Sequence, residues 1–124
     1  MAQHNDTGKA GEERAVEFLA GSGYNILERN YHFKHKEVDI IAEIDNLIVF
    51  FEVKTRSEGF MESPAEAVTP KKQRFIIEAA NYYIDQHNIQ KEVRLDVISI
   101  TFAGGKATLE HIPEAFHPEV KRTR

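Results

Sequence analysis

Apolar residues recur along the chain with two different periods, and each period predicts a type of secondary structure. A spacing of three and four residues over residues 8–20 places Ala15 and Leu19 on one stripe and predicts a helix. A second helix is predicted over residues 70–87, because Thr69 suits the N-cap and the proline after it suits the first helical position.

Alternation of apolar and polar residues, with period two, predicts the strands. In chain order these are expected at residues 24–31, 37–44, 47–55, 93–101 and 107–112. A loop is expected over residues 57–68, which contain glycine and proline, and a frayed end at residues 121–124. The order of elements predicts an α/β fold with a mixed β-sheet flanked by helices.

The length of 124 residues predicts a single domain, residues 1–124, with its core at about 8–116, a polar N-terminal end and a basic C-terminal tail. The hydrophobic share of 41% and the charged share of 29% are those of a globular protein. No apolar run approaches the roughly 18–20 residues that cross a bilayer, and no secretory signal begins the chain. The absence of cysteine fits a cytoplasmic location.

The formal net charge is −4, from 16 basic and 20 acidic residues. A protein that coats nucleic acid without regard to sequence would more often be basic, since phosphate neutralisation dominates its affinity. The charge balance permits a local basic stripe and suits a site that gathers carboxylates around a cation. The His32-x-x-His35 pair lacks the further ligands of a zinc site.

The turn-prone pair Asp45-Asn46 sets the register of a hairpin. With a two-residue turn, Asp39 faces Glu52 across the hairpin. Two positions further from the turn, Glu37 faces Lys54. Alternation then places these four charged side chains on one face. The opposite face receives an apolar set, namely Val38, Ile40, Ala42, Phe51 and Val53.

Two carboxylates opposite each other on neighbouring strands are about 4.5–5.5 Å apart at their β-carbons, where like charges destabilise the sheet. A bound Mg²⁺ ion offsets this repulsion, because it takes one or two carboxylates together with water and phosphate oxygens. Ile41 and Phe50 extend the same face, so a helix is expected to cover its far end. The alternative is a solvated hairpin face with a Glu37–Lys54 salt bridge and no bound cation.

Glu12 offers a third carboxylate. It shares the inward stripe of Ala15 and Leu19 at the start of the first predicted helix. A carboxylate there is either a partner of the helix dipole or a ligand aimed at the sheet.

A set of short motifs with this order and spacing resembles the small bacterial YraN family, whose fold is similar to that of archaeal Holliday junction resolvases. The motifs are Gly11-Glu12-x-x-Ala15, Phe18-Leu19, Gly23-Tyr24, Arg29-Asn30, Glu37-Val38-Asp39-Ile40-Ile41-Ala42, Phe51-Glu52-Val53-Lys54-Thr55-Arg56, Ala65-Glu66-Ala67-Val68 and Arg94-Leu95-Asp96-Val97. The resemblance covers roughly residues 8–116. The chain departs from the family pattern at Lys36 and Met61, which bears on loop shape and substrate contacts.

The resemblance implies a restriction endonuclease-like core of the PD-(D/E)xK superfamily. It implies Glu12, Asp39 and Glu52 as metal ligands and catalytic residues, and Lys54 as the catalytic lysine. The main-chain carbonyl of Val53 would be a further ligand. The implied cofactor is Mg²⁺, with Mn²⁺ able to substitute.

The implied function is a metal-dependent endonuclease that hydrolyses phosphodiester bonds in DNA, with branched or structured DNA such as junctions as substrate, in DNA repair and recombination. A homodimer is expected, since two strands need symmetric cuts. The alternative is a binding or assembly module that keeps the nuclease fold with weak catalysis.

Substrate contacts are expected from Lys36, Arg56 and Gln73. Gln73 lies on the inner face of its helix, so the alternative role for it is to tie down buried backbone groups. Further cations for a basic stripe are Lys34, Lys71, Lys72 and Arg74, and Asp96 is a candidate for a position behind the site.

Overall fold

The computed structural model describes residues 2–57 and 68–116. In chain order its elements are α1 (Ala2–Gly21), β1 (Asn25–Phe33), β2 (Lys36–Ile44), β3 (Leu47–Ser57), α2 (Pro70–Gln86), β4 (Glu92–Ala103) and β5 (Lys106–Ile112). Every predicted element is present, and most extend one or two residues beyond the predicted ends. The helix α1 begins six residues earlier than predicted. Most of the predicted loop 57–68 and the predicted frayed end lie outside the described residues.

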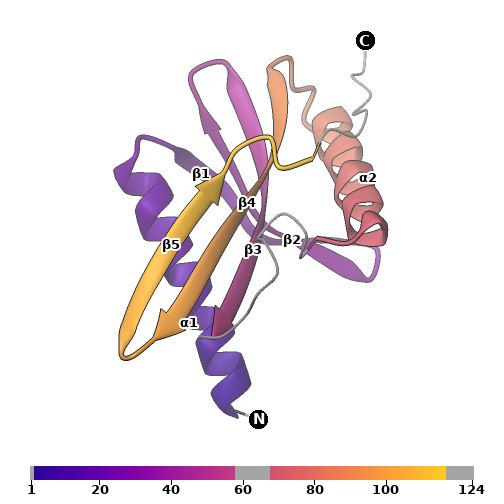
Figure 1. Cartoon of the computed structure of the whole chain (residues 1–124). Helices are drawn as coiled ribbons and strands as arrows, with labels where there is room; N and C mark the ends of the chain where they lie inside the picture. Colours follow the sequence, from indigo (N-terminus) through magenta and orange to yellow (C-terminus); the bar gives the residue numbers. More distant parts are fainter. Residues whose placement is uncertain (1, 58–67, 117–124) are drawn as a thin grey trace.

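The five strands form one sheet in the order β1-β2-β3-β4-β5. The β3–β4 pair is parallel and the other three pairs are antiparallel, so the sheet is mixed. Figure 1 shows α1 and α2 on opposite faces of this sheet. The architecture is the predicted α/β fold, and it is consistent with a restriction endonuclease-like core.

One apolar layer lies between α1 and the sheet. Ala15 and Leu19 of the helix are completely buried there against strand residues, namely Ile40, Ala42, Val49, Phe51, Ile98 and Ile100. The helix lies close to β3 at Gly11, where an added β-carbon would collide with the side chain of Thr55. Glycine is therefore needed at this position for α1 to lie where it does.

The second apolar layer lies between α2 and the other face of the sheet. The helix begins as predicted, because the Thr69 side chain accepts a hydrogen bond from the Lys72 amide and Pro70 lies in the first turn. The buried residues of α2 are Phe75, Ile76, Ala79, Ala80, Tyr83 and Ile84. They pack on Ile41, Ile48, Phe50, Leu95 and Val97 of the sheet. This layer is the predicted helix cover over Ile41 and Phe50.

The two ends of the β1–β2 hairpin pack against different helices. Arg29 pairs with Glu13 of α1, whereas Tyr31, two residues later, packs edge-on against Tyr83 of α2. Between them Asn30 has a left-handed backbone, with φ of 51°. The strands therefore bend at Asn30, and the far end of the hairpin runs under α2 (Figure 1).

Because of this bend, part of the predicted β2–β3 pairing is not formed. The β2–β3 ladder has the predicted register from Ile44–Leu47 to Ile40–Phe51, where the recorded pairing ends. Val38 packs in the α2 layer, so its predicted place beside Ile40 on the α1 face was wrong. The reason is that β2 leaves β3 at this point and follows β1 towards α2.

In the described part of the chain, neither helix is long and apolar enough to cross a membrane.

Candidate metal-binding site

Asp39 lies where β2 separates from β3. Its carboxylate oxygen Oδ2 accepts a hydrogen bond of 2.8 Å from the main-chain amide of Val53. The Asp39 side chain thus accepts from a main-chain amide of β3, just beyond the last main-chain pair of β2 and β3. Because the two main-chain groups of an extended residue point to the same side of the strand, the Val53 carbonyl also faces this opening.

Glu52 is the most buried member of the site, with 4% of its surface exposed. Its Oε2 atom lies 3.1 Å from the Nζ atom of Lys72, in the first turn of α2. Its Oε1 atom is buried and has no hydrogen-bond partner among the described residues. A buried carboxylate oxygen without a partner is costly, so this atom is available to a ligand.

Both carboxyl groups have raised pKa values. Burial is the main cause that raises the pKa of Asp39 to about 7, and the charge of Glu52 adds to it, while the Val53 amide opposes it. Burial also raises the pKa of Glu52, although the charges of Lys72 and Lys54 lower it. Asp39 is bonded to Val53, the residue after Glu52, so the two carboxyl groups lie near each other, although the β2–β3 ladder ends one pair short of the predicted Asp39–Glu52 pair.

Glu12 approaches this pair from α1, and its charge raises the pKa of both Asp39 and Glu52. Its Oε1 atom accepts a hydrogen bond of 3.1 Å from the side-chain amide of Asn30. Asn30 lies between Arg29 and Tyr31, whose partners on β2 are the two neighbours of Asp39. The bend in the hairpin thus holds the partner of Glu12 beside the carboxyl pair, and the pattern of the sequence gave no sign of this.

Lys54 lies two residues after Glu52 on β3 and close enough to lower its pKa. Its alternative predicted partner is Glu37, but the carboxylate of Glu37 contacts Nε2 of His32 at 3.2 Å. The predicted Glu37–Lys54 pairing lies beyond the last pair of the β2–β3 ladder. The charge of Lys54 therefore acts on Glu52 of the carboxylate site.

The atoms at this site suit a hard divalent cation, because carboxylate and carbonyl oxygens are the ligands that Mg²⁺ prefers. The buried Oε1 atom of Glu52 is the clearest sign of such a fit. Within residues 2–57 and 68–116, no three acidic or histidine side chains converge into a complete shell. A cation here would therefore rely on one or two carboxylates and fill its shell with water and substrate oxygens.

The three predicted substrate contacts lie in different surroundings. Lys36 extends over the ring of Phe75, with Nζ 5.2 Å from its centroid. Arg56 is 9% exposed, which leaves little of it on the surface. Gln73 donates a hydrogen bond of 2.9 Å to the main-chain carbonyl of Val68. This is the alternative role predicted for Gln73, in which it holds a backbone group.

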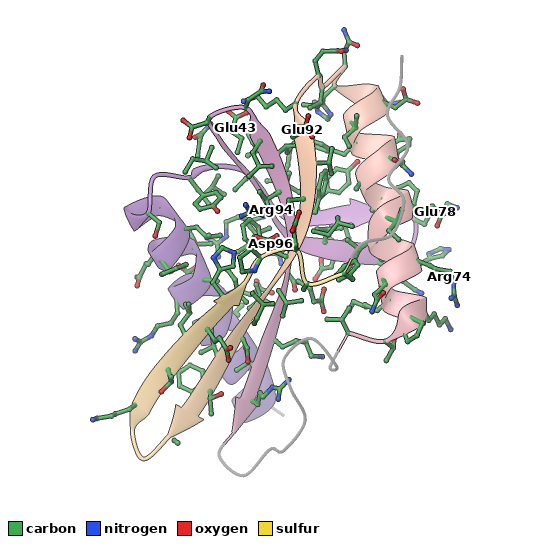
Figure 2. All side chains as sticks on the ribbon, turned by 45° about the horizontal axis from the view of Figure 1, so that its top comes forward. Glu43, Arg74, Glu78, Glu92, Arg94 and Asp96 are labelled. Atoms are coloured by element: carbon green, nitrogen blue, oxygen red, sulfur yellow. The ribbon has the colours of Figure 1, made fainter. Side chains whose placement is uncertain are left out.

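Asp96 belongs to a separate polar network and not to the carboxylate cluster. It is fully buried, and it accepts hydrogen bonds from Arg94, from Nε2 of His111 at 2.7 Å and from the Glu114 amide. Burial alone would raise the pKa of Asp96, but these hydrogen bonds lower it. Figure 2 shows Arg94 and Asp96 side by side on the sheet. The network fastens β4 and β5 together and to the segment after β5.

Comparison with known proteins gives one consistent result. The profile described as "Uncharacterised protein family UPF0102" matches residues 11–100. The UPF0102 protein of Flavobacterium psychrophilum is 42% identical over 117 residues, covering 94% of this chain and 98% of its own. The UPF0102 protein of Phocaeicola vulgatus is 42% identical over 120 residues, covering 97% and 99%. The UPF0102 protein of Christiangramia forsetii is 43% identical over 116 residues, covering 94% of this chain and 98% of its own.

Proposed function

Since the chain belongs to the uncharacterised protein family UPF0102, whose description names no activity, we propose its function from the site. It is a Mg²⁺-dependent endonuclease that hydrolyses phosphodiester bonds in DNA, and its substrates are branched or otherwise structured DNA. The observation that carries this proposal is the buried carboxylate of Glu52, which has one oxygen without a partner among the described residues, with the half-buried Asp39 beside it where the β2–β3 pairing ends.

A structural role explains this pair poorly. Two neighbouring carboxylates, one of them buried and the other half-buried, destabilise a fold unless a cation or a proton compensates them. Lys72 contacts one oxygen of Glu52 only, and the other oxygen stays without a partner in the described part of the chain. A divalent cation would satisfy both carboxylates at once, which is why we favour a metal site over an ion-pair network.

In the proposed mechanism Asp39, Glu52 and the Val53 carbonyl would hold the cation, and Glu12 would join them through a water molecule. The cation, when bound, lowers the pKa of a water molecule and stabilises charge on the scissile phosphate. Lys54 supplies a fixed positive charge beside the same phosphate, where it orients the attacking water or stabilises the developing charge. Asn30 holds Glu12 towards the opening.

The proposal is tested by cleavage of labelled four-way junctions, flaps and linear duplex in Mg²⁺, Mn²⁺ or EDTA. The wild type is expected to cut the branched substrates in Mg²⁺ and Mn²⁺ and not in EDTA. Loss of one group that stabilises the transition state costs about 100-fold or more, so Glu52→Gln and Lys54→Met should lose at least that much activity.

The matched control is Glu43→Gln. Glu43 lies on β2 like Asp39, but its carboxylate pairs with Lys91 and Asn25 near the β2–β3 turn. This variant should cut at the wild-type rate. Equal cleavage by all variants would assign the activity to another site or to a contaminant. DNA binding without cleavage in any metal, unchanged in Asp39→Asn, would instead favour the binding-module alternative.

A further inference from the structure

Lys72 occupies a position that the proposed mechanism does not use. Its Nζ atom lies 3.1 Å from Oε2 of Glu52. The first turn of α2 delivers it there, because Thr69 caps the helix at the Lys72 amide. Gln73 fixes the preceding segment through its hydrogen bond to the Val68 carbonyl. The backbone of Lys72 is therefore held firmly beside the carboxylate cluster.

The two partners of this ion pair differ strongly in exposure. The Glu52 side chain is 5% exposed, whereas that of Lys72 is 42% exposed. Lysine carries a compact charge on a flexible four-carbon stem. The ammonium group can consequently leave the pair for solvent without unfolding any element, whereas Glu52 is fixed in the sheet.

A lysine also satisfies Glu52 incompletely. Its ammonium group compensates the charge at Oε2, and Oε1 remains buried without a hydrogen bond among the described residues. Asp39, the neighbouring carboxyl, is bound to the Val53 amide and lies within the electrostatic reach of Lys72. A single cation placed between the two carboxylates would compensate both of them better than the lysine does.

We propose that Lys72 is a displaceable counter-ion, which holds the cation position at Glu52 until a divalent ion takes it. The inference rests on the metal site of the proposed function and adds to it a competition between two cations. With Lys72 in place, the metal-free protein keeps its buried carboxylate compensated. Metal binding then releases the ammonium group towards the opening, where a phosphate of the substrate would meet it.

The test is isothermal titration calorimetry with Mg²⁺ on the full chain. Lys72→Met and Lys72→Gln remove the competing charge, so both should bind Mg²⁺ about fivefold more tightly than the wild type, as expected from the loss of one partly exposed ion pair. Lys72→Arg keeps the charge and should bind Mg²⁺ no more tightly than the wild type. The control Lys106→Met removes the same charge from an exposed lysine at the start of β5 and should leave the affinity unchanged.

A second measurement uses the wild type alone and so does not depend on the folding of a variant. Acetylation of lysines, followed by mass spectrometry, should modify Lys72 more slowly than Lys71 in EDTA. Addition of Mg²⁺ should raise the rate at Lys72 and leave that at Lys71 unchanged.

Two results would overturn the inference while leaving the metal-dependent nuclease intact. One is that Lys72→Met and Lys72→Gln bind Mg²⁺ as the wild type does, or more weakly. The other is a Lys72 acetylation rate that does not respond to Mg²⁺. Absence of Mg²⁺ binding in the wild type and in every variant would overturn the proposed function as well, so the two failures are distinguishable.

Discussion

At the scale of single residues, Asp39 makes the folded state depend on pH. Burial and the charge of Glu52 raise its pKa to about 7 in the folded protein, against an ordinary value of 3.8. Between these two values the folded state binds a proton that the unfolded state does not. The free energy of unfolding of the metal-free protein should therefore rise as the pH falls from 8 to about 5.

Asp39→Asn removes this pH dependence and keeps an oxygen that accepts from the Val53 amide. Because the buried charge is gone, the variant should be more stable than the metal-free wild type at pH 8, by about 1–2 kcal/mol. Mg²⁺ binds the folded state only, so it should stabilise the wild type and not the variant. Urea unfolding at pH 8 and pH 5.5, with and without Mg²⁺, measures both effects.

Glu43→Gln is the control for this prediction, since Glu43 lies on the same strand but its bond from Lys91 lowers its pKa. It should gain no stability at pH 8 and keep the response to Mg²⁺. A variant at Asp39 that is less stable than the wild type at pH 8, or is still stabilised by Mg²⁺, would contradict the assignment of Asp39.

At the scale of elements, the distance between α1 and β3 decides whether Glu12 reaches the carboxyl pair. Gly11 sets this distance, because a β-carbon there would collide with the Thr55 side chain. Gly11→Ala should push α1 away from the sheet and cost about 1–3 kcal/mol of stability. It should also weaken Mg²⁺ binding, since it moves Glu12 away. Thermal unfolding and calorimetry measure the two consequences.

The same helix provides the matched control. An added β-carbon at Gly8 meets no atom within 4 Å, so Gly8→Ala should raise stability by about 0.5–1 kcal/mol through helix propensity. Thr55→Ala removes the hydroxyl oxygen, which makes the worst collision, and should restore much of the stability lost in Gly11→Ala. If Gly11→Ala is as stable as Gly8→Ala, the close contact between α1 and β3 is not what positions Glu12.

At the scale of the whole molecule, a net charge of −4 limits how DNA can bind. Binding must depend on a few cations around the site, such as Lys54, Lys71 and Lys72, and not on a basic surface. Each phosphate neutralised contributes about −0.9 to the slope of log K against log salt, so a slope of about −3 is expected. Fluorescence anisotropy with a junction in Ca²⁺, over a range of salt, measures this slope.

Two lysine variants test which part of the surface contacts DNA. Lys71→Met should reduce the slope by about one, as expected for one phosphate contact. Lys91→Met should leave it unchanged, because Lys91 pairs with Glu43 near the β2–β3 turn. A slope of about −6 or steeper would mean that DNA follows a far larger part of the protein than the carboxylate site.

The sequence by itself determined the elements and part of the site. Helix and strand periods, the Thr69 cap and the Asp45-Asn46 turn act over a few residues, so each can be read without the rest of the chain. The turn fixes the hairpin register as far as the Ile40–Phe51 pair, which brings Asp39 and Glu52 to the point where the ladder ends. The stripe of α1 likewise assigns Glu12 to the side of the helix that faces the sheet.

Only the tertiary structure decided where β2 leaves β3 and which side chains meet there. The bend at Asn30 sends Val38 to the α2 layer, brings the Asn30 amide to Glu12 and ends the β2–β3 pairing beside Asp39. The Lys72–Glu52 pair depends on how α2 docks on the sheet. These contacts join segments far apart in the chain, and their geometry follows from packing two helices on a twisted sheet, which no local pattern encodes.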